Sequence, residues 1–540
     1  MRCPEHRNQR KPSSPCLRQR PFRAPRGGRS QKTRSAVIPS IPGPSSREKS
    51  YLHSSTEKPH MRTGSEYLAS IKNDGRRVFI DGEVVGDVTT HPAFCGATRS
   101  IAHLYDIAAA PENREVMTYT TETGTQALRC FQIPRSAAEL GERRRAAEKW
   151  AESTCGLMGR SPDHVGSFLA GFAAKPALFG SAGDHFAKNV SRFYQYARDN
   201  SLYATYAIVP PQIDRSKPAH QQSDPTLYAG VVKERDDGIV LRGAQQLATG
   251  AALADYVYLS CIHPLTPGDD AYANGVMIPV NAPGVKIYSR RSFASNATST
   301  FDYPLSSRFD ETDALLVLDD VFVPWENVFI YRNRQICWDQ WWKAPSHSYG
   351  NHQAQTRYAT KLRFMLGLTK HINELTGNDA LPPVQVQMGE MAAIATIVES
   401  MVLAQETQSY IDEDGIAWPS KQALYSVMSL QSQLNPKMVD IVRELSGGSM
   451  IMLPSSVHDY ENPETAADLE RYVSSPNASS RKRVALLKMA WDVIGTEFAG
   501  RHQQYEKFYG GASFLVKQNM ARAYDFGRAK QLVDNVLALG

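Results

Sequence analysis

The order of local patterns along the chain is the feature that most constrains its fold. Between about residues 97 and 200, apolar residues recur every three or four positions, as in IAHLYDIA and RRRAAEKWAESTC, which predicts helices. From about 203 to 336 the pattern changes to short β-rich runs separated by turn residues. After about 337 the helical spacing returns over long segments. Helices, then strands, then helices indicate an α+β protein rather than a doubly wound parallel sheet.

The middle region contains a clear hairpin signal. In TLYAGVVKERDDGIVLRGAQQL, two β-rich runs flank Asp236-Asp237-Gly238. Short runs such as YVYLSCI, GVKIYS and ALLVLDDVFVPW follow it. We therefore expect an antiparallel barrel or sandwich there. In the last region, apolar stripes such as Met391, Ile394, Val398 and Met401 favour the core of a helical bundle or a subunit interface over a cofactor site.

The basic charge of the chain belongs to its first 60 residues. They contain 14 Lys/Arg and 3 Asp/Glu, whereas the whole chain has 61 and 55, so the remainder is mildly acidic. This balance argues against a nucleic-acid surface. The segment is also rich in Pro and Ser, which predicts disorder. We expect either upstream sequence from an over-long reading frame or, less favoured, a targeting segment. The expected regions are a tail (1–60), an N-terminal helical domain (61–204), a β-barrel domain (205–336) and a C-terminal helical bundle (337–540).

Missing motifs narrow the function classes further. The sequence has no GxGxxG after a strand, no GxxxxGK[ST], no HExxH and no GxSxG. Its seven cysteines show no metal-type spacing, so we expect free thiols in a reducing compartment, the cytoplasm, and no metal site. No run of 18 apolar residues occurs, so no membrane span is expected.

The stretch CGLMGRSPDH places an arginine directly before a helix start. Ser161 suits the N-cap, Pro162 the first helical position, and Asp163 the positive end of the helix dipole. Arg160 is not needed for that helix to begin. Taken alone, the stretch favours a surface arginine on a loop.

The chain resembles the oxygenase components of the 4-hydroxyphenylacetate 3-monooxygenase family. The resemblance is carried by MRTGSEYLASIKNDGRRVFIDGEVVGDVTTHPAF, MGRSPDH, PPQIDRS, GIVLRGAQQLATGAALADY, GGSMIMLPS and RVALLKMAWDVIGTEFAGRHQQYEKF. It implies an acyl-CoA dehydrogenase-like fold with a helical front, a β-barrel middle and a four-helix bundle behind, in a homotetramer or dimer. It also implies a two-component enzyme. A separate reductase supplies reduced FAD, which with O2 hydroxylates a phenol ortho to its hydroxyl group.

The resemblance assigns three residues to the substrate hydroxyl. Arg160 matches the family arginine that binds this group, and a guanidinium keeps its charge at any physiological pH. His164 stands where the family commonly has tyrosine, and Tyr206 stands where it commonly has histidine. This exchange leaves the identity of the phenol open. Packing of both as ordinary polar residues is the plain alternative.

The resemblance also assigns residues to the flavin. These are Tyr206, Gln212, Asp214, Arg215, Thr249, Gly448, Ser449 and Met450. Without the resemblance, the glycines before Ser449 would be interpreted as the end of a helix. Arg308 is expected to support the β-module, and the His352-Gln353 pair matches a family pair without an assigned role.

Other functions remain as alternatives. Hydroxylases of chlorophenol, nitrophenol or carrier-bound tyrosine share the family scaffold. A 4-hydroxybutyryl-CoA dehydratase would need a cluster of cysteines that the sequence does not show. An acyl-CoA dehydrogenase would need a carboxylate base, which the Arg160 loop does not provide. A non-enzymatic helical assembly protein is the last alternative.

Overall fold

The computed structural model describes residues 61–539, so the predicted basic tail lies outside the described residues. The first described helix, α1 (Gly64–Ile71), begins at a capping box formed by Thr63 and Glu66. Each of these two side chains accepts a hydrogen bond from the other residue's backbone N–H group. This cap fixes the start of the helix close to Met61, which packs partly buried against the core.

Helices dominate the chain up to residue 200, as the apolar spacing predicts. The elements are α2 (Cys95–Ala109), α3 (Arg114–Met117), α4 (Ala137–Ser153), α5 (Pro162–Ala173), α6 (Pro176–Gly180) and α7 (Asp184–Asp199), with a small hairpin of β3 (Thr118–Thr120) and β4 (Gln126–Leu128). Every residue of α5 from Pro162 to Phe172 is buried. This helix therefore lies inside the protein, with no side facing solvent.

The middle of the chain forms two sheets rather than one closed barrel, so the barrel in the predicted fold is not confirmed by the described strands. The larger sheet has the order β2-β1-β10-β11-β7-β6, and the smaller has β12-β9-β8-β5. The strands are β1 (Val78–Ile80), β2 (Glu83–Val84), β5 (Ala204–Ala207), β6 (Gly230–Arg235), β7 (Gly238–Gln245), β8 (Tyr256–Leu259), β9 (Gly275–Pro279), β10 (Val285–Ser289), β11 (Ala314–Pro324) and β12 (Val328–Ile330).

The strand pairing agrees with the sequence prediction at one hairpin and differs from it at two parallel pairs. The predicted hairpin is confirmed, because β6 and β7 pair with Arg235 opposite Gly238. Two other pairs, β1 with β10 and β5 with β8, are parallel, although an antiparallel module was expected. Turn residues reveal only strands that are neighbours in sequence, and these two pairs join distant strands. Because β1 and β2 lie before residue 85, the larger sheet also takes in chain from outside 205–336. The domain boundaries stay a prediction.

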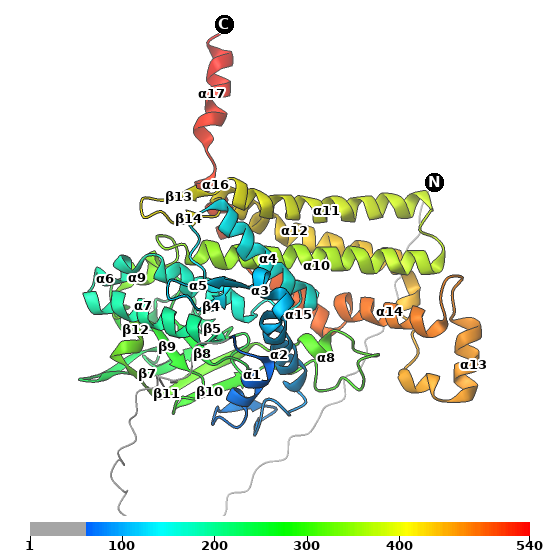
Figure 1. The fold of residues 1–540 in the computed structure, drawn as a ribbon, viewed down its shortest axis with the longest axis horizontal. Coiled ribbons are helices and arrows are strands. Elements are labelled where there is room, and N and C mark those ends of the chain that lie inside the picture. The colour runs from blue at the N-terminus through cyan, green and yellow to red at the C-terminus, as the bar shows by residue number, and fades with distance from the viewer. Residues whose placement is uncertain (1–60, 540) are drawn as a thin grey trace, which may run out of the picture. The chain divides into compact units, whose positions relative to one another are not determined.

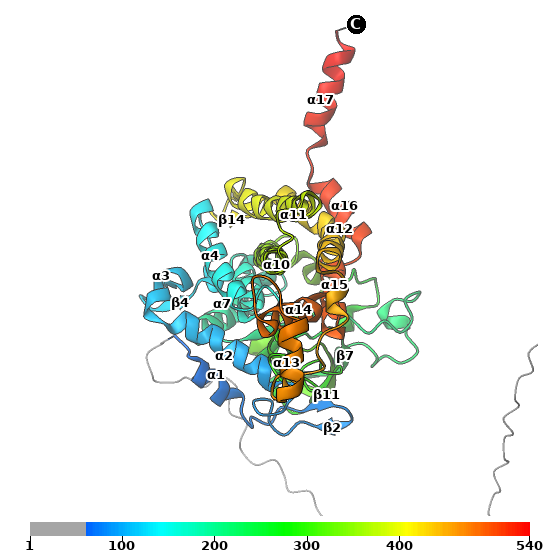
Figure 2. The same ribbon diagram turned by 90° about the vertical axis from the view of Figure 1, so that its right-hand side faces the viewer.

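The C-terminal region is helical. Its main helices are α10 (Ser346–Thr376), α11 (Pro382–Thr407), α12 (Lys421–Ser446), α14 (Ser480–Ile494) and α15 (Glu497–Phe508). In Figures 1 and 2, α10, α11 and α12 run side by side, with α15 against α12. Smaller elements are α8 (Ser306–Phe309), α9 (Arg334–Asp339), β13 (Tyr410–Ile411), β14 (Ala417–Trp418), α13 (Pro463–Tyr472), α16 (Ser513–Ala523) and α17 (Phe526–Leu537).

Helices α11 and α17 are among those that leave apolar side chains uncovered. Along α11, Met391, Ile394 and Val398 are buried, whereas Val386 and Ile397 are exposed. Within the described residues, α11 is also the one helix that is long and apolar enough to cross a membrane, by length and composition only, and core helices of soluble proteins can meet the same criteria. The terminal helix α17 points away from the other helices in both views and buries none of its residues.

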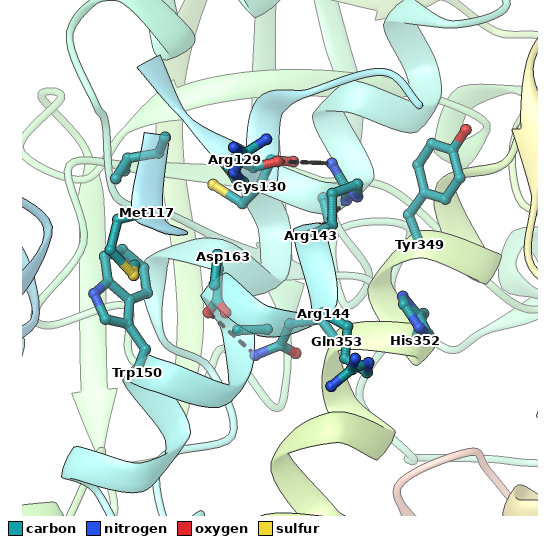
Figure 3. A pocket seen from close by; sticks show the side chains of 14 residues that line it. Met117, Arg129, Cys130, Arg143, Arg144, Trp150, Asp163, Tyr349, His352 and Gln353 are labelled. Atoms are coloured by element: carbon teal, nitrogen blue, oxygen red, sulfur yellow. Dashed lines mark hydrogen bonds between the residues drawn. The ribbon is translucent and has the colours of Figure 1, made fainter. Parts of the chain in front are cut away.

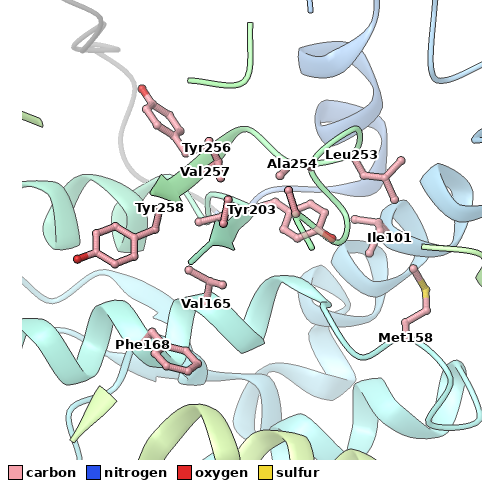
Figure 4. Packing of buried hydrophobic residues seen from close by; sticks show 14 of the residues in the cluster. Ile101, Met158, Val165, Phe168, Tyr203, Leu253, Ala254, Tyr256, Val257 and Tyr258 are labelled. Atoms are coloured by element: carbon pink, nitrogen blue, oxygen red, sulfur yellow. The ribbon is translucent and has the colours of Figure 1, made fainter. Parts of the chain in front are cut away.

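One continuous core joins the helices to the sheets. Figure 4 shows Val165 of α5 on the side of Tyr203 and Tyr258, which come from the strand region, whereas Phe168 lies on the other side of the helix. On its other side, α5 packs against α10. The start of α5, where Arg160 lies, is thereby fixed between a sheet and the bundle.

Candidate active site

Arg160 lies at the centre of a buried aromatic cluster. Its side chain is buried, so the interpretation as a surface loop arginine is wrong. Nη1 donates to the Tyr505 hydroxyl at 2.6 Å, and Nη2 donates to the Tyr206 hydroxyl at 3.0 Å. The guanidinium carbon is 5.2 Å from the ring centres of Tyr206 and Tyr509 and 5.3 Å from that of Tyr505. The turn before α5 therefore carries its arginine inward.

Two hydrogen bonds fix the Arg160 backbone. Its N–H donates to the Glu311 carboxylate at 2.9 Å, and its carbonyl oxygen accepts from the Tyr203 hydroxyl at 2.6 Å. The preceding turn passes through Gly156 at a φ of +65°, a conformation that favours glycine. Any Cβ there would also approach the Arg357 carbonyl oxygen to 2.5 Å. Sequence position alone did not reveal this tight contact with α10.

The surroundings keep Arg160 charged. Burial by itself would lower the pKa of its guanidinium, but Tyr206, Tyr505, Tyr509 and Glu311 together raise that pKa above its ordinary value. A permanent positive charge in a desolvated cluster of phenol rings interacts strongly with any anion that reaches it. The site is therefore suited to an anionic oxygen.

His164 lies one helical turn beyond Arg160 and is fully buried. Its ring centre is 5.5 Å from that of Tyr206, so the two exchanged residues lie side by side. Its Nδ1 atom lies 3.1 Å from the Gln353 amide oxygen. Burial first, and the nearby Arg160 second, lower the pKa of His164 well below its ordinary value. The imidazole is therefore neutral at physiological pH.

Ser161, Pro162 and Asp163 stand at the start of α5 as predicted, but the Ser161 side chain does not cap the helix. The Ser161 hydroxyl makes no cap hydrogen bond and instead donates to the Asp163 carboxylate at 2.5 Å. Asp163 is buried, and burial raises its pKa to about 6. A buried carboxylate at the second helical position competes for the hydroxyl that would otherwise cap the backbone.

We expect Asp163→Asn to change how stability depends on pH. Because the folded-state pKa of Asp163 lies above its ordinary value of 3.8, this carboxyl lowers stability increasingly as pH rises from about 4 to 6. Relative to the parent, the variant should gain about 2 kcal/mol between pH 4.5 and pH 7.5. Urea unfolding at both pH values measures the change. A difference between variant and parent that is the same at both pH values would contradict a raised pKa.

Thr249 is the predicted flavin residue nearest to this cluster. It is buried, and its carbonyl oxygen accepts from Thr205, the neighbour of Tyr206 on β5. Its hydroxyl donates to Asp313 at 2.7 Å. Burial would raise the pKa of Asp313, but Arg501 and Arg290 hold it far below its ordinary value. The ionised Asp313 carboxylate can only accept hydrogen bonds, so the Thr249 hydroxyl must donate its hydrogen to it. The lone pairs of the Thr249 oxygen remain available to accept a hydrogen bond from another group.

The other predicted flavin residues lie on two separate segments. Gln212 and Arg215 are exposed on the loop after β5, and Asp214 there is half-buried and accepts hydrogen bonds from Ser216. Gly448, Ser449 and Met450 belong to a turn, η6 (Gly447–Met450), which packs against α12 and α14.

The structure therefore brings together only some of the predicted substrate and flavin residues. Arg160 and His164 both contact Tyr206, and Thr249 is joined to this group through β5. The Ser449 hydroxyl accepts a hydrogen bond from Arg483. Among the described residues, no hydrogen bond or ring contact joins the Gly448–Met450 turn to Arg160, His164, Tyr206 or Thr249.

Sequence reasoning missed the contribution of α15. Tyr505 and Tyr509 contact Arg160, yet the segment RHQQYEKFYG was noted only as part of the resemblance. The signal was there, because two tyrosines four residues apart share one face of a helix. The sequence did not show that this helix face contacts the turn that carries Arg160. That turn lies far earlier in the chain, since 345 positions separate Arg160 from Tyr505.

A cluster of buried charged and polar side chains next to the aromatic cluster holds α15 in place. Glu506 accepts from both Nη atoms of Arg357 at 2.6 and 2.9 Å, from Lys361 at 3.0 Å and from Gln431 at 2.6 Å. All four side chains are buried. Burial would raise the pKa of Glu506, but Arg357 and Lys361 hold it at about 2. Tyr505, the neighbour of Glu506, is positioned by the same contacts.

Comparison with known proteins gives a consistent result. The N-terminal family model described as 4-hydroxyphenylacetate 3-hydroxylase N terminal matches residues 63–330, and the corresponding C-terminal model matches residues 337–538. A 4-hydroxyphenylacetate 3-monooxygenase oxygenase component of Pseudomonas aeruginosa is 38% identical over 88% of this chain and 91% of its own length. The oxygenase component of a 4-nitrophenol 2-monooxygenase from a Rhodococcus species is 36% identical over 86% of this chain and 88% of its own.

A solved structure agrees in fold. The crystal structure of the oxygenase component of a 4-hydroxyphenylacetate 3-monooxygenase, complexed with FAD and 4-hydroxyphenylacetate, superimposes with a TM-score of 0.84. It is 33% identical and covers 88% of this chain and 98% of that chain. This likeness confirms the predicted fold class, apart from the closed barrel.

Proposed function

Because the chain belongs to the 4-hydroxyphenylacetate 3-hydroxylase family, we propose that it is the oxygenase component of a two-component, FADH2-dependent monooxygenase. It hydroxylates a phenol ortho to its hydroxyl group, using O2. The observation that carries the proposal is the buried Arg160 guanidinium, which donates to two phenol oxygens beside an uncharged imidazole.

The geometry suits a phenolate. A ring carrying a phenolate oxygen is more electron-rich than a neutral phenol, so an electrophilic oxidant attacks it faster. Arg160 stabilises the negative oxygen, and Tyr206 and Tyr505 hold the guanidinium in one orientation. His164 is neutral and can therefore take the phenolic proton. These three contacts assign Arg160, His164 and Tyr206 as the proposed catalytic residues.

The residues present fit a flavin. Thr249 presents free lone pairs that accept from a flavin N–H group, since its own proton is given to Asp313. We propose that Tyr206, Gln212, Asp214, Arg215, Thr249, Gly448, Ser449 and Met450 hold the cofactor. Reduced FAD supplies the electrons that activate O2. The chain's own residues bind the phenol, orient it and hold its proton.

A reconstitution with a reductase tests this function directly. The purified chain, any NADH:flavin reductase, FAD and NADH should convert 4-hydroxyphenylacetate or a related phenol to the catechol, detected by chromatography. A panel that includes 4-nitrophenol and 4-chlorophenol addresses the His164/Tyr206 exchange. A related family member acts on 4-nitrophenol, as its name states, so a nitrophenol, a chlorophenol or a carrier-bound tyrosine is the alternative substrate. No hydroxylated product from any phenol would refute the function.

We predict that the isolated protein is colourless or faintly yellow and oxidises no NADH by itself. The expectation follows from the missing nicotinamide motif and from the separate reductase that a two-component enzyme needs. Absorbance at 450 nm measures bound oxidised FAD, and absorbance at 340 nm measures NADH. Stoichiometric tightly bound FAD together with direct NADH oxidation would contradict the two-component assignment.

We also propose a cytoplasmic homotetramer, with a dimer as the alternative. Exposed apolar side chains on α11 and α17 support self-association, because such surfaces are normally covered. The five cysteines in the described part of the chain are free thiols, which suits a reducing compartment. Light scattering of the purified chain measures the number of subunits.

A further inference from the structure

Gln353 of α10 lies directly behind His164 and bridges it to Asp163. Its side chain is buried, with the amide oxygen 3.1 Å from His164 Nδ1. The amide nitrogen donates to Asp163 Oδ1 at 3.1 Å and lies 3.4 Å from the Ser161 hydroxyl oxygen. Figure 3 shows the amide of Gln353 facing Asp163 across the gap between α5 and α10. The four residues form one chain of hydrogen bonds that leads into the candidate active site.

Asp163 sets the donor-to-acceptor direction of these hydrogen bonds. An ionised carboxylate only accepts hydrogen bonds, and Oδ1 already accepts from Ser161. The amide nitrogen of Gln353 must therefore face Asp163, which leaves its oxygen facing His164. With a pKa of about 6, raised by burial, Asp163 is ionised at neutral pH.

The orientation of the amide in turn sets the tautomer of His164. An amide oxygen cannot donate, so Nδ1 of the neutral imidazole carries the hydrogen. The other ring nitrogen, Nε2, then holds a lone pair. Nε2 is buried and has no hydrogen-bond partner among the described residues. The ring lies next to Tyr206 and Tyr509, the side chains that also surround Arg160.

We propose that Gln353, held by Asp163 and Ser161, is a positioning residue that fixes His164 as the acceptor of the substrate's phenolic proton. The inference rests on the proposed function and adds to it. The phenolic O–H bond breaks, the proton forms a new bond to Nε2, and the electron pair stays on the oxygen beside Arg160. The resulting imidazolium keeps its Nδ1 hydrogen on the Gln353 oxygen, and the proton returns when the product leaves. With the other tautomer, Nε2 would carry a hydrogen and could not accept one.

The ionisation of a bound phenol tests this without flavin. 4-Nitrophenol is yellow only as its phenolate, so absorbance of the bound ligand against pH gives its apparent pKa. In Gln353→Met, which keeps the volume but removes the amide, we expect this apparent pKa to rise by about one unit, a tenfold loss of ionisation. The amount of catechol formed per oxygen consumed should also fall in this variant. The groups facing His164 that can affect the titration are Arg160, Arg357, Tyr206, Tyr509 and, behind Gln353, Asp163.

Gln355→Met is the matched control. Gln355 is equally buried on the same helix, but its amide donates to the Leu424 carbonyl and accepts from Gln405, away from His164. The Gln355→Met variant should be less stable than the parent, but the apparent pKa of bound 4-nitrophenol should stay the same. A shift of the same size in both variants would mean that loosening α10 is the cause, and it would overturn the positioning role.

A second pair of variants decides the question if Gln353→Met does not fold. In Asp163→Asn the acceptor is no longer fixed, so the Gln353 amide can turn and the ionisation should weaken. In the double variant Asp163→Asn with Gln353→Glu, the new amide donates to the new carboxylate, which accepts from Nδ1, so ionisation should return. Equal apparent pKa values in the single and double variants would overturn the proposal. A parent protein that binds no phenol would instead refute the proposed function, which separates the two failures.

Discussion

Replacing Arg160 with alanine should lower the rate of phenol hydroxylation by about a hundredfold, and the product formed per oxygen consumed should fall as a result. A charged, oriented donor at a developing anion typically contributes on the order of 3 kcal/mol. Oxygen consumption should continue, because reduced flavin reacts with oxygen without a phenol, and the electrons should appear as hydrogen peroxide. Catechol and peroxide measured together against oxygen uptake give the coupling. Coupling that stays near the parent value would show that Arg160 has a structural role only.

Arg160→Lys distinguishes charge from geometry. An ammonium keeps the positive charge but lacks the planar fork through which Arg160 donates to both Tyr206 and Tyr505. We expect coupling between the values of the parent and of Arg160→Ala. Melting temperatures check that both variants fold, since Pro162 and the buried face of α5 remain in place.

Replacing Glu506 with alanine should destabilise the protein by about 3–5 kcal/mol. The change leaves Arg357 and Lys361 buried without their shared counter-charge, the costly way to break a buried ion pair. The pKa of Lys361 already lies below its ordinary value, because burial outweighs the attraction of Glu506. Urea unfolding measures the loss. Because Glu506 titrates at about 2 in the folded state, below its ordinary 4.5, its contribution is present above about pH 4.5 and disappears as the pH falls toward 2.

Glu497→Ala is the control on the same helix. Glu497 pairs with Arg291 at 3.2 Å, and both side chains are 63% exposed. An exposed pair of this kind contributes at most about 1 kcal/mol. A similar loss of stability in both variants would contradict the distinction between the buried and the exposed pair.

Periodicity and turn residues predicted the order of helices, strands and helices, and they predicted the β6–β7 hairpin. They did not predict that β5 and β8 pair in parallel, since hydrogen bonding between distant strands leaves no local pattern in the sequence. The same limit applies to the candidate site. Arg160 could be singled out because it is unnecessary for the helix start. Tyr505 and Gln353 could not be assigned, because their roles depend on which helix packs against α5.

The segment through Trp491 and Phe498 gives a further example. Its apolar residues recur every three or four positions, but α14 ends at Ile494 and α15 begins at Glu497. Thr496 caps the new helix by accepting from the Ala499 N–H group. Tyr505, on the new helix, contacts Arg160.

The long sequence separation between Arg160 and Tyr505 affects how the enzyme matures. Partners 345 residues apart cannot meet until nearly the whole polypeptide has left the ribosome. A chain that stops before Glu497 would contain every strand of both sheets and still lack Tyr505 and Tyr509, which contact Arg160. Completion of synthesis is therefore needed before Tyr505 can hold the Arg160 guanidinium in its native orientation.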